Sequence, residues 1–184
     1  MVTIIAFIIG MSGIAAMLIL NNYLGLVIAA ILITIKTLGD AIDGKIARGS
    51  ETASPMGGFL DIIVDWLFFH AAFFIAIGIL TGHIMIGFLC VTGYMSREFA
   101  RTKFTAKYGT KITETSEAKK VSGIVSIVKK YDLAALTLIA PLILLLNQPA
   151  LIIYVAVIME YGLLFGELIF DFVCLSRLSN QAKK

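Results

Sequence analysis

Long apolar segments alternate with short polar breaks along the whole chain. A membrane-spanning helix needs about 20 mostly apolar residues, and six segments approach or reach that length. Their boundaries are set by polar residues, by glycine or by proline, which favour turns. The pattern therefore predicts an all-α integral membrane protein with six transmembrane helices, at residues 3–20, 24–45, 57–80, 84–104, 128–146 and 150–174.

The composition supports a membrane location. Of the 184 residues, 59% are hydrophobic and only 15% are charged, and the mean hydropathy is +0.96. These values exclude an ordinary soluble domain. We expect one domain over residues 1–184, in contact with membrane lipids and without a nucleic-acid partner. The first segment has no Lys or Arg before it and no small-residue cleavage site after it, so we interpret it as a mature helix.

The basic residues predict an orientation. Lys and Arg accumulate in cytoplasmic loops, and here the turns at 21–22, 81–83 and 147–149 carry none of the fifteen. All of them fall at the other ends of the segments. We therefore expect a multi-pass cell membrane protein whose two termini face the cytoplasm.

Four aspartates lie at the cytoplasmic ends of the second and third segments. A carboxylate left unpaired inside a membrane costs roughly 2.5 to 3.5 kcal/mol, so four of them together indicate a bound divalent metal. If residues 36–48 continue the second helix, five residues fall within a sector of about 140°. A glycine there allows close approach to the backbone and an arginine suits a phosphate. The five are Asp40, Asp43, Gly44, Ala47 and Arg48.

The third segment contributes a second acidic face. Ser54 is a candidate N-cap and Pro55 a suitable first helical residue. Gly57, Asp61 and Asp65 follow at intervals of four and share one stripe of that helix. Two facing helices with two carboxylates each would suit two hard cations held by oxygen ligands.

The complete pattern reads D-x-x-D-G-x-x-A-R, eight residues, then G-x-x-x-D-x-x-x-D. In this chain it is DAIDGKIAR, GSETASPM and GGFLDIIVD, covering residues 40–65. It resembles the signature of the CDP-alcohol phosphotransferases, also called CDP-alcohol phosphatidyltransferases, at every fixed position. The resemblance implies six helices around a polar cavity open to the cytoplasm, and a homodimer.

The resemblance also implies a reaction. Members of the family move the phosphatidyl group of a CDP-linked lipid, such as CDP-diacylglycerol, onto a small alcohol and release CMP. By position, Asp40, Asp43, Asp61 and Asp65 would hold two divalent cations, Mg²⁺ or Mn²⁺, and Asp65 would also be the general base. The expected contacts to the CDP-alcohol are Gly44, Ala47, Arg48, Ser54, Gly57 and Thr3.

A basic stretch offers candidates for the acceptor site. Residues 97–130 contain nine Lys or Arg, which positive-inside bias and anionic headgroups would explain by themselves. A phosphorylated polyol, such as glycerol 3-phosphate or inositol phosphate, would also need cations near the metals. Arg97-Glu98-Phe99 resembles a segment of phosphatidylglycerophosphate synthases. We expect acceptor contacts from Arg97 and Arg101, then from Lys119 and Arg177.

Two alternatives remain open from the sequence. Residues 44–48 with Ser54-Pro55 also resemble the choline and ethanolamine phosphotransferases, which use amino alcohols. A divalent-cation transporter would also place acids in a membrane, but it needs no glycine, alanine and arginine at fixed offsets. Three acids in the last segment are expected to form structural ion pairs: Glu160, Glu167 and Asp171.

Overall fold

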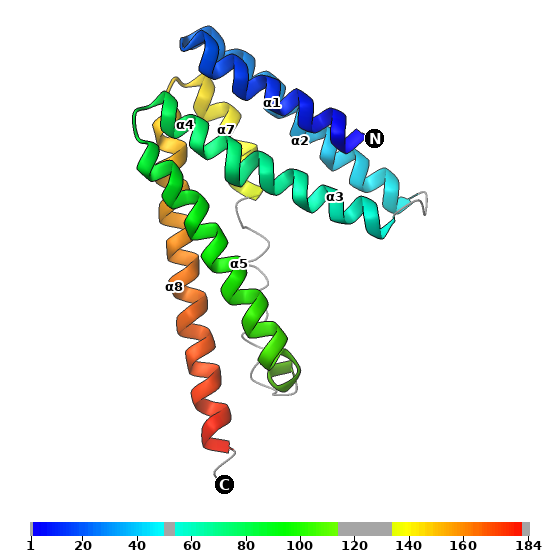
Figure 1. Cartoon of the computed structure of the whole chain (residues 1–184), viewed down its shortest axis with the longest axis vertical. Helices are drawn as coiled ribbons and strands as arrows, with labels where there is room; N and C mark the ends of the chain where they lie inside the picture. Colours follow the sequence, from blue (N-terminus) through cyan, green and yellow to red (C-terminus); the bar gives the residue numbers. More distant parts are fainter. Residues whose placement is uncertain (1, 50–53, 114–133, 182–184) are drawn as a thin grey trace.

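The computed structural model describes residues 2–49, 54–113 and 134–181, and within these ranges every regular element is helical. The helices follow one another in an up-and-down order (Figure 1). They are α1 (Val2–Leu20), α2 (Tyr23–Gly49), α3 (Pro55–Asp65), the π-helix η1 (Trp66–Phe73), α4 (Phe74–Leu80), α5 (Ile84–Thr113), α7 (Ala134–Leu145) and α8 (Pro149–Gln181).

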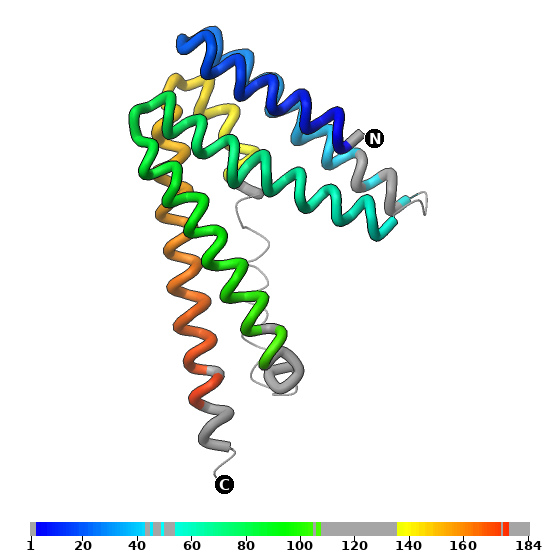
Figure 2. The backbone as a smooth tube through the Cα atoms, in the orientation of Figure 1, coloured from blue at the N-terminus to red at the C-terminus, as the bar shows by residue number. Residues whose placement is uncertain are grey.

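The helices form a V with two arms. The first arm consists of α1, α2, α3 and η1, and the second arm consists of α5 and α8 (Figures 1 and 2). Within the arms, α1 packs along α2 and α5 packs along α8. The arms meet at a vertex, where α4 contacts both α5 and α8 and where α7 contacts both α2 and α8. The signature residues therefore lie in the first arm, and the start of the basic stretch lies in the second.

The three short turns predicted from the sequence all lie at the vertex (Figure 1). Each contains one residue with a positive φ angle: Asn21 (43°), Gly82 (73°) and Asn147 (57°). Glycine adopts this left-handed conformation without a steric penalty, and asparagine tolerates it better than most residues. The local chemistry of these turns is thus sufficient to end the helices where the sequence indicated.

The core lies at the vertex and is rich in aromatic residues. Phe68, Phe73, Phe74 and Ile77 are all at most 1% exposed and pack in one cluster with α1, α2, α7 and α8. The rings of Phe68 and Phe73 stack at 13° with their centroids 6.2 Å apart. Residues five apart face the same way in a π-helix because its hydrogen bonds run from i to i+5. The winding of η1 therefore aligns these two rings.

Four of the six predicted spans are confirmed within the described residues as helices long and apolar enough to cross a membrane: Thr3–Leu20, Tyr23–Ile42, Pro55–Leu80 and Pro149–Val173. The predicted span at 84–104 is helical as part of α5, but from Arg97 onward this helix contains charged residues. The predicted span at 128–146 contains the short apolar helix Leu136–Leu145. The predicted start of this span at 128 lies outside the described residues. Six complete spans remain a prediction.

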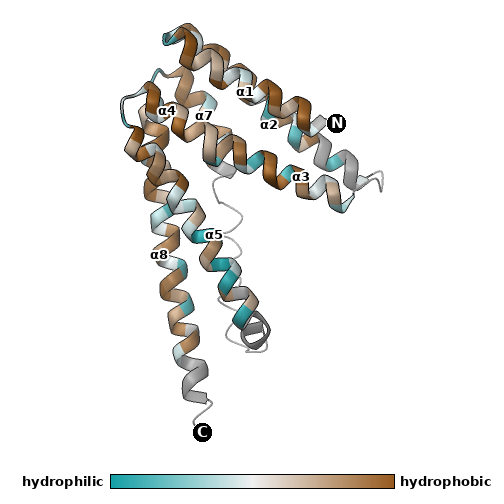
Figure 3. Cartoon of the chain, viewed as in Figure 1, coloured by the Kyte–Doolittle hydropathy of each residue, from teal (hydrophilic) through white to brown (hydrophobic). Residues whose placement is uncertain are grey.

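The surface is that of a lipid-facing protein. Only 28% of the Thr3–Leu20 stretch is buried within the chain, so most of its apolar side chains point outward. Figure 3 shows hydrophobic residues covering the vertex and much of both arms, whereas hydrophilic residues concentrate toward the C-terminal half of α5. Exposed apolar surface on this scale requires a lipid environment.

Candidate functional site

The start of α3 confirms the predicted helix cap. Ser54 adopts an extended conformation and caps the helix, its Oγ accepting a hydrogen bond of 3.0 Å from the Gly57 N–H. Pro55 is the first helical residue, where its missing N–H is not needed. A Cβ added to Gly57 would lie 3.1 Å from that Oγ, whereas one added to Gly58 would meet nothing within 4 Å. Gly57 is therefore the tighter of the two positions.

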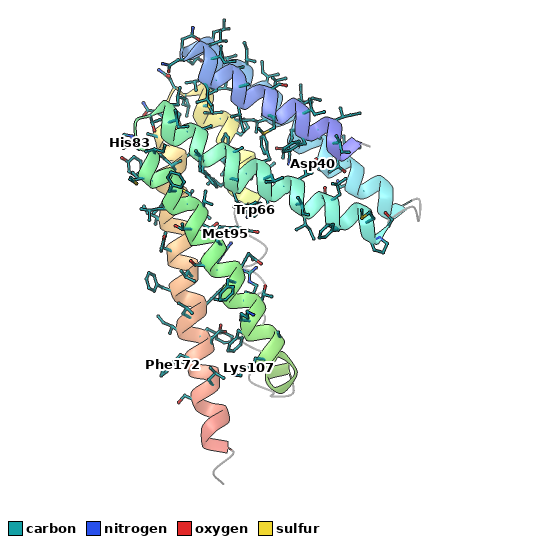
Figure 4. The ribbon with its side chains drawn as sticks, in the orientation of Figure 1. Asp40, Trp66, His83, Met95, Lys107 and Phe172 are labelled. Atoms are coloured by element: carbon teal, nitrogen blue, oxygen red, sulfur yellow. The ribbon has the colours of Figure 1, made fainter. Side chains whose placement is uncertain are left out.

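Asp40 and Asp65 are brought to one point by a third residue. The ammonium of Lys36 forms ion pairs with Asp40 Oδ2 and with Asp65 Oδ1. Lys36 and Asp40 are one turn apart on α2, and Asp65 is the last residue of α3. Lys36 thus joins one aspartate from each half of the signature. Figure 4 shows Asp40 in the first arm.

The two carboxylates differ in their environment. The Asp40 side chain is 16% exposed and the Asp65 side chain is 46% exposed. Asp40 Oδ1 is buried and has no hydrogen-bond partner among the described residues. A buried carboxylate oxygen with unused lone pairs is costly. It would be satisfied by a metal ion, so this oxygen fits the expected site.

The remaining signature residues are placed less fully. Asp61 lies one turn before Asp65 and is exposed. Asp43, Gly44, Ala47 and Arg48 belong to α2, but their side chains lie outside the described part. Among the described side chains, no three His, Cys, Asp or Glu converge on one point. The expected four-aspartate metal site, and with it the CDP contacts, therefore stay a prediction, as does the contact from Thr3 near the start of α1.

Lys36 was not predicted as a site residue, because its charge was expected only as part of the cytoplasmic basic residues. Its side chain is 1% exposed, and its ammonium lies 4.6 Å from the ring centre of Phe69 and 5.1 Å from that of Phe68. Helical spacing contained the signal, since a lysine at i−4 shares a face with Asp40. A Cβ on Gly10 of α1 would come within 3.1 Å of Lys36 Cγ and 2.6 Å of Phe68, so α1 closes over this lysine.

The predicted acceptor residues Arg97 and Arg101 lie in ion pairs between α5 and α8. Arg97 is 1% exposed, with its Nε 3.2 Å from Oε2 of the fully buried Glu160. Arg101 donates to Glu167 (2.8 Å) and to Glu98 (2.7 Å), and it is 24% exposed. The predicted structural pairing of these two α8 acids is thus observed, with α5 supplying the partners.

An aromatic contact joins the two arms near the aspartates. His70 of η1 stacks on Tyr94 of α5, with ring centroids 3.4 Å apart and an interplanar angle of 13°. The Arg97 guanidinium lies 5.9 Å from the same tyrosine ring. The stack therefore links η1, which follows Asp65 in the chain, to the segment of α5 that contains Arg97. Nothing in the sequence spacing indicated this pairing, because it depends on the crossing of η1 and α5.

Two other candidates cannot be placed. Lys119 lies outside the described residues, and the side chain of Arg177 near the end of α8 does as well. Lys107 is far from Asp40, toward the free end of the second arm (Figure 4). The contribution of Lys119 and Arg177 to an acceptor site stays a prediction.

Comparison with known proteins identifies the family. The chain is 33% identical over 81 residues to an archaetidylinositol phosphate synthase of Aeropyrum pernix, which is 39% of this chain and 42% of the relative. The match thus spans less than half of that relative's length. No solved structure is significantly similar. Residues 1–165 match the family of CDP-alcohol phosphatidyltransferases. The chain therefore belongs to the CDP-alcohol phosphatidyltransferase family.

Proposed function

We propose that this protein transfers a phosphatidyl-type group from a CDP-alcohol, CDP-diacylglycerol in the first instance, to the hydroxyl of an acceptor alcohol, and that it releases CMP. The observation that carries the proposal is the convergence of Asp40 and Asp65 on one cationic group. These aspartates come from the two halves of the signature, on separate helices. Family membership supports the same reaction.

The residues have separate roles in this proposal. Asp40, Asp43, Asp61 and Asp65 would hold two divalent cations, Mg²⁺ or Mn²⁺. When bound, the cations would neutralise charge that develops on the diphosphate. The Asp65 side chain is 46% exposed, so it remains accessible to take the proton of the acceptor hydroxyl.

The CDP-alcohol would contact the signature residues between the aspartates. Arg48 would bind phosphate through its planar guanidinium. Ser54 uses its Oγ as an acceptor in the helix cap, which leaves its O–H able to donate to the donor substrate. Gly57 would leave room for the nucleotide beside α3.

The acceptor we propose is a phosphorylated polyol. The name of the Aeropyrum relative contains an inositol phosphate, which agrees with such an acceptor, and Arg101 offers a partly exposed guanidinium. An amino alcohol is the alternative and would not need this charge. The active site and both termini would face the cytoplasm, because the vertex turns carry no Lys or Arg. By analogy with the family, two copies would form a homodimer.

The reaction can be tested with the purified full chain in lipid vesicles. CDP-diacylglycerol, Mg²⁺ and a panel of acceptors should release CMP with at least one acceptor, and Asp65→Asn should abolish the release. Asp171→Asn makes the same change on α8, away from the signature, and should retain activity. If no acceptor elicits CMP while the vesicles take up divalent cations, and Asp43→Asn abolishes that uptake, the protein is a transporter.

A further inference from the structure

Lys36 is a buried cation placed between two acidic residues of the proposed active site. Its ammonium forms ion pairs with Asp40 of α2 and with Asp65, the last residue of α3. Two rings, Phe68 and Phe69, lie within 5.1 Å of it. A lysine 1% exposed loses nearly all of its hydration, so it depends on these neighbours for stabilisation.

The position of this ammonium has a consequence for metal binding. Two carboxylates facing each other repel, and one positive charge between them removes most of that repulsion. A divalent cation bound by both Asp40 and Asp65 would need the Oδ atoms that now accept from Lys36. The ammonium and such a cation would also repel each other. The Lys36 ammonium and a divalent cation therefore compete for the same position between Asp40 and Asp65.

We propose that Lys36 is a positioning residue: its ammonium holds Asp40 and Asp65 together in the metal-free protein and is displaced when a divalent cation binds them. The inference rests on the proposed metal site. The aromatic rings give the displaced ammonium a favourable surface, since they already lie at cation–π distance. Asp40 Oδ1, buried and without a partner among the described residues, offers the entering cation a first ligand before Lys36 leaves.

The test measures binding of Mn²⁺ alone to the full chain in detergent micelles. Lys36→Met keeps an unbranched side chain against the rings but removes the charge, and it should tighten Mn²⁺ binding by at least about tenfold, because a like charge at the site is lost. Lys36→Arg keeps the charge and should bind Mn²⁺ about as the unmodified protein does. Lys103→Met removes an exposed charge on α5 and should leave the affinity unchanged.

Thermal unfolding gives a second readout. Without metal, Lys36→Met should melt at a lower temperature than the unmodified protein, because two carboxylates then face each other with no cation. Added Mn²⁺ should raise its melting temperature by more than it raises that of the unmodified protein, since tighter binding stabilises more. A residue that serves only the packing would lower stability and would not tighten Mn²⁺ binding.

The outcomes separate the two proposals. Unchanged or weaker Mn²⁺ binding by Lys36→Met overturns the role of Lys36, as does failure of this variant to fold even in excess Mn²⁺. Recovery of folded Lys36→Met only in the presence of Mn²⁺ supports displacement. If the unmodified protein binds no Mn²⁺, the metal site of the proposed function is wrong, and the displacement falls with it.

Discussion

The buried pair of Arg97 and Glu160 gives the sharpest stability prediction. Arg97 is 1% exposed and Glu160 is fully buried, with Nε and Oε2 3.2 Å apart. Glu160→Gln keeps the shape of the side chain and removes its charge. Breaking a buried pair by removing one partner costs about 3 to 5 kcal/mol, because the other charge stays buried. Arg97 keeps its ring contact with Tyr94. We therefore expect Glu160→Gln to lower the free energy of unfolding by about 3 kcal/mol, the lower end of this range.

A matched control lies two turns along the same helix. Glu167 is 19% exposed and pairs with Arg101, which is 24% exposed and also bonded to Glu98. Both groups are only partly buried, and Arg101 keeps one carboxylate after the change. Glu167→Gln should therefore cost less than about 1 kcal/mol. The two variants carry the same substitution and differ mainly in the burial of the pair.

The assay is reversible unfolding in mixed micelles, followed by fluorescence. Trp66 is the single tryptophan, and it begins η1 between the signature and the vertex, so its emission should report loss of packing there. The free energy of unfolding of each variant is compared with that of the unmodified protein at one detergent composition. If Glu160→Gln costs no more than Glu167→Gln, the burial of the Arg97–Glu160 pair does not control stability, and the reasoning is refuted.

Three further predictions concern the site and its orientation. Gly57→Ala should lower the rate of CMP release and gain little stability, because its Cβ would lie 3.1 Å from the capping oxygen; Gly58→Ala, with open space around its Cβ, should gain up to about 1 kcal/mol in a thermal melt. Arg101→Ala should raise KM for a phosphorylated acceptor several-fold while Lys103→Ala leaves it unchanged; equal values would remove Arg101 from the acceptor site. In inside-out vesicles, a membrane-impermeant thiol reagent should label Lys103→Cys and spare Gln148→Cys, and the reverse labelling would invert the proposed topology.

The features predicted correctly from the sequence are local ones. The Ser54 cap, the proline that follows it and the three short turns are each decided by a few neighbouring residues. The pairing of Lys36 with Asp40 was also predictable, because helical periodicity sets which residues of one helix share a stripe. Such features require no knowledge of how distant helices cross.

The features missed depend on contacts between helices. The π-helical winding of η1 aligns Phe68 with Phe73, and the stack of His70 on Tyr94 joins η1 to α5. Neither follows from hydrophobic pattern alone, since an apolar stretch from 57 to 80 reads as one uninterrupted α-helix. The partners of Glu160 were likewise unpredictable, because only the packing of α5 against α8 selects Arg97 among the basic residues.

The burial of two basic residues changes how the charge pattern bears on topology. Lys36 and Arg97 are each 1% exposed and bound to carboxylates, so they are not the solvated loop charges to which the positive-inside rule refers. Removing both from the count leaves the predicted orientation unchanged, because the turns at 21–22, 81–83 and 147–149 contain no Lys or Arg. The basic residues of this chain therefore have two distinct functions. Those outside the helix contacts would set the predicted orientation, and those inside neutralise acids where one helix meets another.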